Sequence, residues 1–460
     1  MTSKPRTAII GGGIAGVTAA WQLAQIDPTQ DVTLFEASPR LGGIVETVRR
    51  EGFVVECGPD GWITEKPWAR ELAEELGLGN ELISSLDATR ITYILRNGRL
   101  IPIPDGMRMM VPTDLEALTR SELFSPAAIA AYASEPGRAE ELRAATPDRD
   151  ESVASFVLRH FGEEVLHTVA APLLSGVFGG DVTRLSVRAV MPAFVQMERE
   201  HGSLILALQS KPKTASPQPI FTSLASGSGS LIERMVAAIP PEWIRLNTTV
   251  SDLVTAGQAW TVELAGKPPS YQDFDRVIVA TPGHISRQLL GGIVDTALLP
   301  FEATSAVIIA LAFTQPFDLP PGFGFLVPDG ETNNLLAGTF IDQKFPNRVP
   351  QGTHLLRAFF GGERAPAIAI MPDDEIAAQA FEELQKILGP LPEPSFTIVR
   401  RWPHSLPQYA VGHLDRLAEL DRQVAQHPGL HLLGNAYRGV GLPDLIREAR
   451  TLAREIAQPK

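Results

Sequence analysis

Short apolar runs separated by glycine-rich or polar turns open the chain and predict a strand, a helix and a second strand. Residues 6–10 end in three apolar residues, as in a short buried strand. Residues 14–24 are mostly small or apolar and contain no proline, which is typical of a buried helix. The apolar run at residues 32–35 predicts the second strand. The pattern therefore indicates a βαβ unit at the start of the chain.

Three later apolar runs predict further strands. Residues 277–280 precede Thr-Pro and have the character of another parallel strand. Residues 307–313 and 355–360 are apolar runs bounded by turns, so we expect them to be antiparallel strands of a second sheet.

Helical patterns lie between these strands. Residues 152–171 carry apolar side chains three and four positions apart, which predicts an amphipathic helix. Residues 231–239 predict a shorter helix after a serine- and glycine-rich loop. Thr113 and Glu116 have the spacing of a capping box, so we expect a helix to begin there.

Three glycines after the first strand, Gly11, Gly13 and Gly16, have the spacing GxGxxG. In a dinucleotide-binding unit the first allows a tight turn, the second lets a pyrophosphate approach the backbone, and the third lets helix and strand pack closely. The N-terminus of the helix favours the phosphates. Glu36, 20 residues after Gly16, is placed to accept hydrogen bonds from ribose hydroxyls. These features together predict a dinucleotide site.

Two more glycine-rich loops favour FAD over NAD. Gly42 and Gly43 follow Glu36 closely, and residues 56–61 read Glu-Cys-Gly-Pro-Asp-Gly. A nicotinamide dehydrogenase has no need of these loops. An enzyme that holds FAD along its whole length uses them to bring backbone N–H groups to the second phosphate and to the flavin ring.

The composition excludes several other functions. Acidic residues outnumber basic ones by 53 to 40, and the resulting net charge of −13 argues against nucleic-acid binding. A single cysteine excludes an internal disulfide and a thiolate-bound zinc or iron–sulfur site. The histidines lack metal-ligand spacing, so no metal is predicted.

The sequence also bears on location. The N-terminus lacks the apolar core of a signal peptide, and the longest uncharged apolar stretch, residues 303–317, is shorter than the about 20 residues of a membrane-spanning helix. We therefore expect a cytoplasmic protein. A peripheral position at the inner face of the membrane is left open.

Four stretches resemble the amine-oxidase-like FAD superfamily and, within it, the oxygen-dependent protoporphyrinogen and coproporphyrinogen oxidases of haem synthesis. The first is residues 6–61, which is typical of the whole superfamily. The other three are residues 172–186 (PLLSGVFGGDVTRLS), 322–328 (GFGFLVP) and 432–444 (LLGNAYRGVGLPD). Together the four extend over nearly the whole chain and are specific to the porphyrinogen oxidases.

The resemblance implies an α/β fold with a Rossmann-like FAD-binding domain of the amine-oxidase type, a mixed-sheet substrate domain and an inserted helical domain. The FAD-binding domain would be assembled from residues 1–85, 215–290 and 400–460. Residues 86–214 would form the helical domain beside the substrate cavity. Residues 291–399 would form the β-rich substrate domain.

The resemblance also implies the FAD contacts. A backbone contact to adenine falls on Val250, and a helix that begins near Pro443 points its positive end at the flavin pyrimidine edge. Amine oxidases with covalent flavin carry a cysteine near their C-terminal FAD motif, whereas the one cysteine here is Cys57, so FAD is predicted to be non-covalent. The predicted contacts are Gly11, Gly13, Ile14, Ala15, Gly16, Glu36, Ala37, Gly42, Gly43, Gly58, Pro59, Asp60, Gly61, Val250, Gly434, Asn435, Val440, Gly441 and Leu442.

One residue is predicted to be catalytic. Gly176 matches the family glycine that lies against the flavin face. There the missing side chain lets the substrate stack closely, and the carbonyl is the suggested proton acceptor. The other reading of Gly176 is an ordinary loop glycine.

Six residues are predicted to bind the substrate. Four match positions that sandwich the macrocycle, although such apolar residues are as typical of plain core; they are Phe178, Leu326, Phe340 and Phe359. In mitochondrial and chloroplast protoporphyrinogen oxidases an arginine pairs with a propionate, and Thr92 stands at that position here. Arg90, expected on the same strand face, is predicted to substitute for it.

The predicted activity is FAD-dependent oxidation of a porphyrinogen to the porphyrin, a loss of six electrons with O2 as acceptor. Residues 102–106 and 111–114 look more like the coproporphyrinogen oxidases, which slightly favours coproporphyrinogen III over protoporphyrinogen IX. A transient contact with the next haem-pathway enzyme is left open. The alternatives are another flavin amine oxidase or desaturase of the superfamily and an FAD-binding protein without catalysis.

Overall fold

The computed structural model of the chain describes residues 4–211, 218–257, 259–300, 302–332, 334–362 and 365–458. The chain forms two compact units. Unit 1 consists of Met1–Ser85, Pro219–Ala303 and Asp415–Lys460, and unit 2 of Leu86–Gln218 and Thr304–Leu414.

A parallel five-stranded sheet forms the centre of unit 1, with the strand order β12-β2-β1-β16-β22. Its strands are β1 (Arg6–Ile10), β2 (Asp31–Phe35), β12 (Ile244–Arg245), β16 (Arg276–Val279) and β22 (Leu430–Leu432). The chain passes from β1 to β2 on one side and reaches β16 on the other. The carboxyl ends of β1 and β16 are therefore a topological switch point, where sheets of this kind bind ligands.

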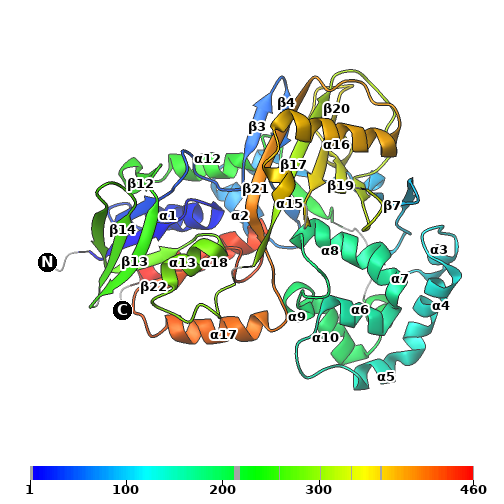
Figure 1. The fold of residues 1–460 in the computed structure, drawn as a ribbon, viewed down its shortest axis with the longest axis horizontal. Coiled ribbons are helices and arrows are strands. Elements are labelled where there is room, and N and C mark those ends of the chain that lie inside the picture. The colour runs from blue at the N-terminus through cyan, green and yellow to red at the C-terminus, as the bar shows by residue number, and fades with distance from the viewer. Residues whose placement is uncertain are drawn as a thin grey trace. The chain divides into compact units, whose positions relative to one another are not determined.

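Both faces of this sheet are covered, because alternate residues of each strand point to opposite faces. Ile9 packs in one core with helices α1 (Ile14–Ile26), α2 (Trp68–Glu75), α12 (Gly229–Ala237) and α18 (Leu442–Ala457). Ala8 and Ile10 pack in a second core with the antiparallel strands β13 (Val250–Ala256), β14 (Ala259–Leu264) and β15 (Ser270–Phe274) and with helices α13 (Gly283–Leu290) and α17 (His413–Val424). Helices α1 and α18 lie side by side (Figure 1). Smaller strands complete the unit: β3 (Thr47–Arg50), β4 (Phe53–Glu56), β5 (Trp62–Ile63), β6 (Leu82–Ser84) and β11 (Phe221–Leu224).

A seven-stranded mixed sheet forms the centre of unit 2, in the order β21-β17-β20-β19-β18-β7-β8. Its strands are β7 (Thr92–Arg96), β8 (Arg99–Pro102), β17 (Ala303–Phe313), β18 (Gly324–Leu326), β19 (Leu335–Phe340), β20 (His354–Phe360) and β21 (Phe396–Pro407). Strand β18 pairs with β7 in parallel. The pairs β17–β20, β20–β19, β19–β18 and β7–β8 are antiparallel.

Helices lie on both faces of this sheet. Helices α15 (Ala365–Ala369) and α16 (Asp373–Leu388) close the apolar core on one face. Helix α8 (Ala171–Phe178) packs against β18 and β19. The other elements of unit 2 are α3 (Leu115–Thr119), α4 (Pro126–Ser134), α5 (Ala139–Ala144), α6 (Val153–Phe161), α7 (Glu163–Val165), the π-helix η4 (Leu166–Ala170), α9 (Val187–Val190), α10 (Pro192–His201), α11 (Leu204–Gln209), α14 (Ile341–Lys344), and the short strands β9 (Met107–Arg108) and β10 (Val111–Pro112). Within the described ranges, no helix is long and apolar enough to cross a membrane.

The structure divides the chain differently from the three predicted domains. Strands β7 and β8 come from the stretch predicted as the helical domain, yet they extend the sheet of the predicted substrate domain. The two predicted domains therefore form one compact unit. Residues 400–407, predicted in the FAD-binding domain, are the end of β21 in unit 2. Strand pairing decides these boundaries, because backbone N–H and C=O groups must find partners across long sequence separations.

The predicted strands at residues 6–10, 32–35, 277–280, 307–313 and 355–360 are confirmed within a few residues at their ends. Two helical predictions are corrected. The helix expected at residues 152–171 is interrupted at Gly162, whose φ of 84° is left-handed. The capping box at Thr113 is wrong, because Asp114 is the N-cap and accepts hydrogen bonds from the N–H groups of Glu116 and Ala117.

Candidate cofactor and substrate sites

The glycines that follow β1 have different structural roles. Gly11 has a φ of +105°, and a Cβ there would lie 2.6 Å from the carbonyl oxygen of Ala280. A Cβ at Gly16 would lie 1.9 Å from the carbonyl oxygen of Gly11, so both positions require glycine for the fold itself. A Cβ at Gly13 would meet nothing within 4 Å. The open space at Gly13 is the room that a pyrophosphate needs beside the backbone.

Gly13 is also the N-cap of α1. Helix α1 has no side-chain cap and no acidic residue in its first turn. The N–H groups at this end, which include those of the predicted contacts Ile14, Ala15 and Gly16, therefore have no competing side-chain anion. They form the positive end of a 13-residue helix and suit a phosphate.

Glu36 lies at the carboxyl end of β2, beside the glycine loop. Its carboxylate accepts hydrogen bonds from the N–H of Gly12 at 2.7 Å and from the N–H of Ser38 at 2.8 Å. Each carboxylate oxygen has a second acceptor position, which leaves room for ribose hydroxyls. The N–H of Thr248 donates to the carbonyl of Glu36 at 2.9 Å and brings the start of β13, where Val250 lies, to the same end of the sheet.

The Gly42–Gly43 doublet lies against the glycine loop that follows β1. The N–H of Gly42 donates to the carbonyl of Gly12 at 2.7 Å. A Cβ at Gly43 would lie 3.2 Å from the Cα of Gly13. The first two predicted FAD motifs are therefore adjacent in space, and their backbones meet at Gly13.

The C-terminal motif meets the third motif through an ion pair that sequence reasoning missed. Gly441 is the N-cap of α18, which begins at Leu442 as predicted for a helix starting near Pro443. Asp444, in the first turn of α18, accepts a hydrogen bond at 2.6 Å from the Nζ of Lys66. Lys66 follows residues 58–61 closely, so the ion pair joins the two motifs. The sequence feature that could have indicated this ion pair is a lysine five residues after the glycine-rich stretch 56–61.

Tyr437 anchors the loop between β22 and α18. Its side chain lies in the second core of unit 1. Burial raises the pKa of Tyr437 to about 12, so the phenol stays uncharged at neutral pH. The buried, uncharged ring of Tyr437 therefore fixes the loop that carries Gly434, Asn435 and Val440 to the core of unit 1.

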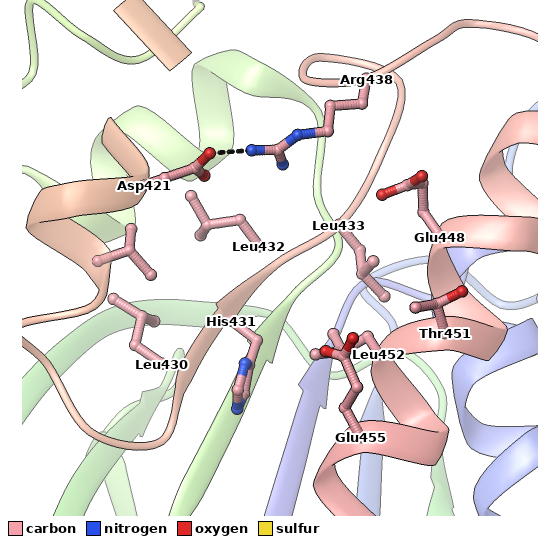
Figure 2. Close-up of a pocket in the computed structure, with 11 residues that line it drawn as sticks. Asp421, Leu430, His431, Leu432, Leu433, Arg438, Glu448, Thr451, Leu452 and Glu455 are labelled. Carbon is pink, nitrogen blue, oxygen red and sulfur yellow. Dashed lines mark hydrogen bonds and ion pairs between the residues drawn. The ribbon is translucent and has the colours of Figure 1, made fainter. Parts of the chain in front are cut away.

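A pocket of about 240 Å³ opens at the outer edge of β22. Figure 2 shows its lining from β22, α17 and α18, with Asp421 and Arg438 paired at one side. The lining contains none of the predicted FAD contacts. The cofactor prediction therefore rests on the glycine loops at the carboxyl ends of the strands and not on this pocket.

In unit 2, strand register assembles an apolar row on the sheet face opposite the α15–α16 core. The row crosses five strands and consists of Ile308, Phe359, Ala337, Leu326 and Ile94. Neighbouring strands lie about 4.8 Å apart, so Leu326 and Phe359, with β19 between them, are about 10 Å apart. Thr92 lies one row further along the same face.

Gly176 lies in the last turn of α8 and is exposed. A Cβ there would have one neighbour within 4 Å, the Cδ2 of Leu326 at 3.5 Å. The structure therefore brings three predicted residues, Gly176, Leu326 and Phe359, to one face of unit 2. The missing side chain leaves that face open at Gly176.

Phe178 and Phe340 are not brought to this row. Phe340 is 1% exposed and packs in the opposite core, because its register partner on β20 is Leu356. Phe178 lies two residues after Gly176, about 200° around the helix, and its ring packs 6.3 Å from that of Tyr409. A shift of one residue in position decides on which face of a strand or helix a side chain lies. A run of apolar residues in the sequence does not show that shift.

Arg90 is not on the strand that carries Thr92. Strand β7 begins at Thr92, and Arg90 ends a 3-10 turn with its side chain 3.9 Å from Asp87. The expectation of a shared strand face is therefore wrong. Sequence reasoning missed Arg357, a buried cation on the same face as Phe359, whose guanidinium lies 4.9 Å from the centre of the Phe359 ring.

The described part of the chain contains no group of three or more His, Cys, Asp or Glu side chains able to hold a metal ion. Cys57, the only cysteine of the sequence, directly precedes Gly58 and is buried.

Comparison with known proteins identifies the family. The model of the flavin-containing amine oxidoreductases matches residues 14–457. The chain belongs to this family. It is therefore an oxidoreductase, and the predicted flavin cofactor, FAD, is confirmed.

Individual relatives show which members of this family the chain is similar to. The coproporphyrinogen III oxidase of Bacillus subtilis (strain 168) is 33% identical, with 97% of each chain covered. The enzyme of the same name from Staphylococcus aureus (strain NCTC 8325 / PS 47) is 30% identical, with 98% of each covered. A crystal structure from Exiguobacterium sp. 255-15, described as a candidate protoporphyrinogen oxidase, superposes with a TM-score of 0.85 at 32% identity over 99% of both chains. The resemblance to the porphyrinogen oxidases is thereby confirmed.

Proposed function

We propose that this flavin oxidoreductase oxidises a porphyrinogen to the corresponding porphyrin, with coproporphyrinogen III as the preferred substrate and O2 as the final electron acceptor. The observation that carries the proposal is the apolar row on the sheet of unit 2 beside the exposed glycine of α8. A tetrapyrrole macrocycle needs an extended apolar surface with no side chain projecting at the reacting position, and Gly176 with Leu326 and Phe359 supplies one.

The open end of α8 supports a polar role for Gly176. Among the described residues, none donates a hydrogen bond to the Gly176 carbonyl. The carbonyl lies in the last turn of α8, where the helix dipole is negative. It is suited to accept a hydrogen bond from a pyrrole N–H and to stabilise the positive charge that develops as the neighbouring carbon loses hydride.

Bound FAD would supply the acceptor for the hydride equivalents. O2 would then reoxidise the flavin and be reduced to hydrogen peroxide. Three such two-electron steps remove six electrons and three protons. Of the six hydrogens lost, three leave meso carbons as hydride equivalents, one leaves the fourth meso carbon as a proton, and two leave pyrrole nitrogens as protons to water. The residues of the chain bind the cofactor and the substrate and orient them toward each other. Gly13 and the N-terminus of α1 would hold the pyrophosphate, Glu36 the ribose, and the row with Leu326 the macrocycle.

The choice of coproporphyrinogen III rests on the names of the two relatives and on residues 102–106 and 111–114, which resemble the coproporphyrinogen oxidases. Coproporphyrinogen III carries four carboxylates. Arg90, whose side chain is 46% exposed, is the proposed contact for one of them.

The test is anaerobic mixing of the FAD-loaded protein with coproporphyrinogen III, protoporphyrinogen IX and putrescine in turn. We expect coproporphyrinogen III to bleach the flavin fastest and to yield a fluorescent porphyrin, and admission of O2 to restore the flavin and produce hydrogen peroxide. Faster bleaching by protoporphyrinogen IX would overturn the substrate choice. Bleaching by putrescine alone would assign the chain to the amine oxidases, and no bleaching by any of them would leave an FAD-binding protein without this catalysis.

A further inference from the structure

Helix α8 ends in a form in which the described residues beyond the helix give no backbone donor to the carbonyl of Gly176. Gly179 follows the helix in the left-handed conformation, with φ 59° and ψ 19°, and its N–H donates to the carbonyl of Ser175 at 2.8 Å. This single bond defines the αL ending. In the alternative Schellman ending, the N–H of Gly179 would pair with the carbonyl of Gly176 and the N–H of Gly180 with that of Ser175. The observed ending therefore keeps the Gly176 carbonyl free of an internal partner.

A side chain from a distant part of unit 2 holds this ending. The Nε2 of Gln408, which follows β21, donates to the carbonyl of Phe178 at 2.8 Å and to the carbonyl of Leu406 at 3.0 Å. The same Nε2 also lies 3.4 Å from the Oγ1 of Thr304, so three acceptors surround the two N–H groups of the carboxamide. The bond to Phe178 satisfies one of the last carbonyls of α8, which have no partner within the helix.

The same side chain occupies the space beside Gly180. A Cβ on Gly180 would lie 1.8 Å from the Oε1 of Gln408 and 2.8 Å from its Cδ. A side chain on Gly180 would therefore displace the carboxamide of Gln408 from this position. Neither glycine needs a ligand to explain it.

The backbone beside Gln408 is fixed independently of its side chain. The carbonyl of Tyr409 accepts from the N–H of Ser186 at 2.7 Å, and the N–H of Val411 donates to the carbonyl of Arg184 at 2.9 Å. These bonds tie the segment after β21 to the segment after α8. A substitution of the Gln408 side chain therefore leaves its backbone in place.

We propose that Gln408 is a positioning residue that holds α8 in its αL ending and so keeps the Gly176 carbonyl available to the substrate. Without the carboxamide, the carbonyl of Phe178 loses its donor and Gly180 is free to fold back over the helix end. The N–H of Gly179 then pairs with the carbonyl of Gly176, which withdraws that carbonyl from a pyrrole N–H. The part of this inference that concerns the substrate rests on the proposed function.

The experiment compares Gln408→Met with the wild type and with a matched control. Methionine has a similar length to glutamine but lacks both N–H donors. The control is Gln385→Met, because Gln385 also lies in unit 2 and donates from Nε2 to a backbone carbonyl, that of Leu391 at 3.4 Å. If Gln408→Met does not accumulate as folded protein, Gln408→Asn, which keeps the carboxamide on a shorter stem, takes its place.

Two readouts are measured on the FAD-loaded proteins. Residue-resolved hydrogen exchange follows the amides of Gly179 and Gly180, and steady-state kinetics with coproporphyrinogen III gives kcat and KM. We expect altered exchange at these two amides and a fall in kcat of about tenfold, the size of one lost hydrogen bond, with KM within about twofold. The control should match the wild type in both.

Unchanged exchange at Gly179 and Gly180 in Gln408→Met would overturn the inference, whatever the activity. Altered exchange with an unchanged kcat, or with a change confined to KM, would overturn the positioning role. A wild type that oxidises no porphyrinogen would refute the proposed function instead, and the exchange result would still decide whether Gln408 holds the end of α8.

Discussion

The two units build their candidate sites by different means. In unit 1 the predicted FAD contacts are mostly backbone groups of loops next to strands, and the decisive glycines lie within a few residues of one another, as Gly11, Gly13 and Gly16 do. In unit 2 the candidate face consists of side chains from five strands whose order in the sheet differs from their order in the chain. A site made of local backbone is visible as a motif, whereas a site made by strand register is not.

The difference also predicts how each site responds to change. A cofactor cradle formed by close backbone approach should tolerate no added atom. A face formed by separate side chains should lose function by degrees. The four predictions below test this contrast, beginning with the largest expected effect.

Substitutions in the glycine loop after β1 test the contrast between the two units most directly. Gly16→Val should not yield folded protein, because its Cβ would overlap the carbonyl oxygen of Gly11 at 1.9 Å. Gly13→Val should fold, since nothing lies within 4 Å of its Cβ, but it should lose FAD because the side chain fills the phosphate space. Flavin absorbance per chain, together with circular dichroism, separates the two outcomes. A yellow Gly13→Val protein with full flavin content would contradict the proposed cradle.

Unit 2 should also respond to pH in a way that its buried side chains dictate. His160 is 1% exposed and lies 3.0 Å from both Glu135 and Glu198. Burial by itself lowers the pKa of His160, but the hydrogen bonds and charges of Glu135 and Glu198 outweigh it and raise the pKa above its usual value. The stabilisation that protonated His160 gives to the folded chain is therefore complete below the ordinary histidine pKa. It is lost as the pH rises through the raised pKa of His160.

We expect His160→Gln to lower the free energy of unfolding of unit 2 by about 3 kcal/mol near pH 6, because it removes the cation beside buried Glu135, whereas Glu198 keeps Arg159 at 2.8 Å. The loss relative to wild type should shrink near pH 9. Hydrogen exchange of α6 and α10, with α1 of unit 1 as the internal reference, measures it. A loss that is constant between the two pH values would show that His160 is not charged in the folded chain.

The third effect is expected on turnover. Gly176→Val should keep its fold and its FAD, since the added Cβ would contact only the Cδ2 of Leu326 at 3.5 Å. It should lower kcat by about a hundredfold, because displacement of the reacting carbon by about 1 Å costs that much. Anaerobic stopped-flow reduction of the flavin measures the step directly. Reduction at the wild-type rate would mean that Gly176 does not border the reacting position.

The smallest effect is expected at Arg90. Its side chain is 46% exposed and lies 3.9 Å from Asp87, so solvent screens any contact it makes with a substrate carboxylate. Arg90→Ala should raise KM for coproporphyrinogen III by about threefold and leave kcat unchanged, because such a contact is the same in the ground and transition states. Steady-state kinetics at low and high ionic strength checks this. An equal fall in kcat would place Arg90 nearer the chemistry than proposed.

Particular residues show how far sequence reasoning reached. The βαβ unit with Gly11, Gly13, Gly16 and Glu36 was predictable, because each residue type has a local conformational task. The start of α18 near Pro443 was predictable for the same reason. Phe340 was expected beside the substrate, yet it lies in the core, because a bulge in the register between β19 and β20 precedes it.

The helical prediction for residues 152–171 shows another limit. The apolar spacing was correct, but Gly162 interrupts the helix and η4 follows as a π-helix before α8. The spacing reports which face is buried and not whether the backbone is continuous. The predicted boundary between helical and substrate domains failed likewise, since the β7–β8 hairpin joins the sheet through the pairing of β7 with β18, more than 200 residues further along the chain.

The sequence alone established the cofactor class, the glycine loop between β1 and α1, and the family. These depend on glycines, a helix N-terminus and an acid within about 35 residues, where chain connectivity alone brings the groups together. Only the tertiary structure decided that Leu326 and Phe359 share a face while Phe340 does not. It also decided that Gln408 reaches Phe178 across 230 residues. The physical reason is that side-chain direction alternates with every residue of a strand, so a face exists only once the register of all its strands is set.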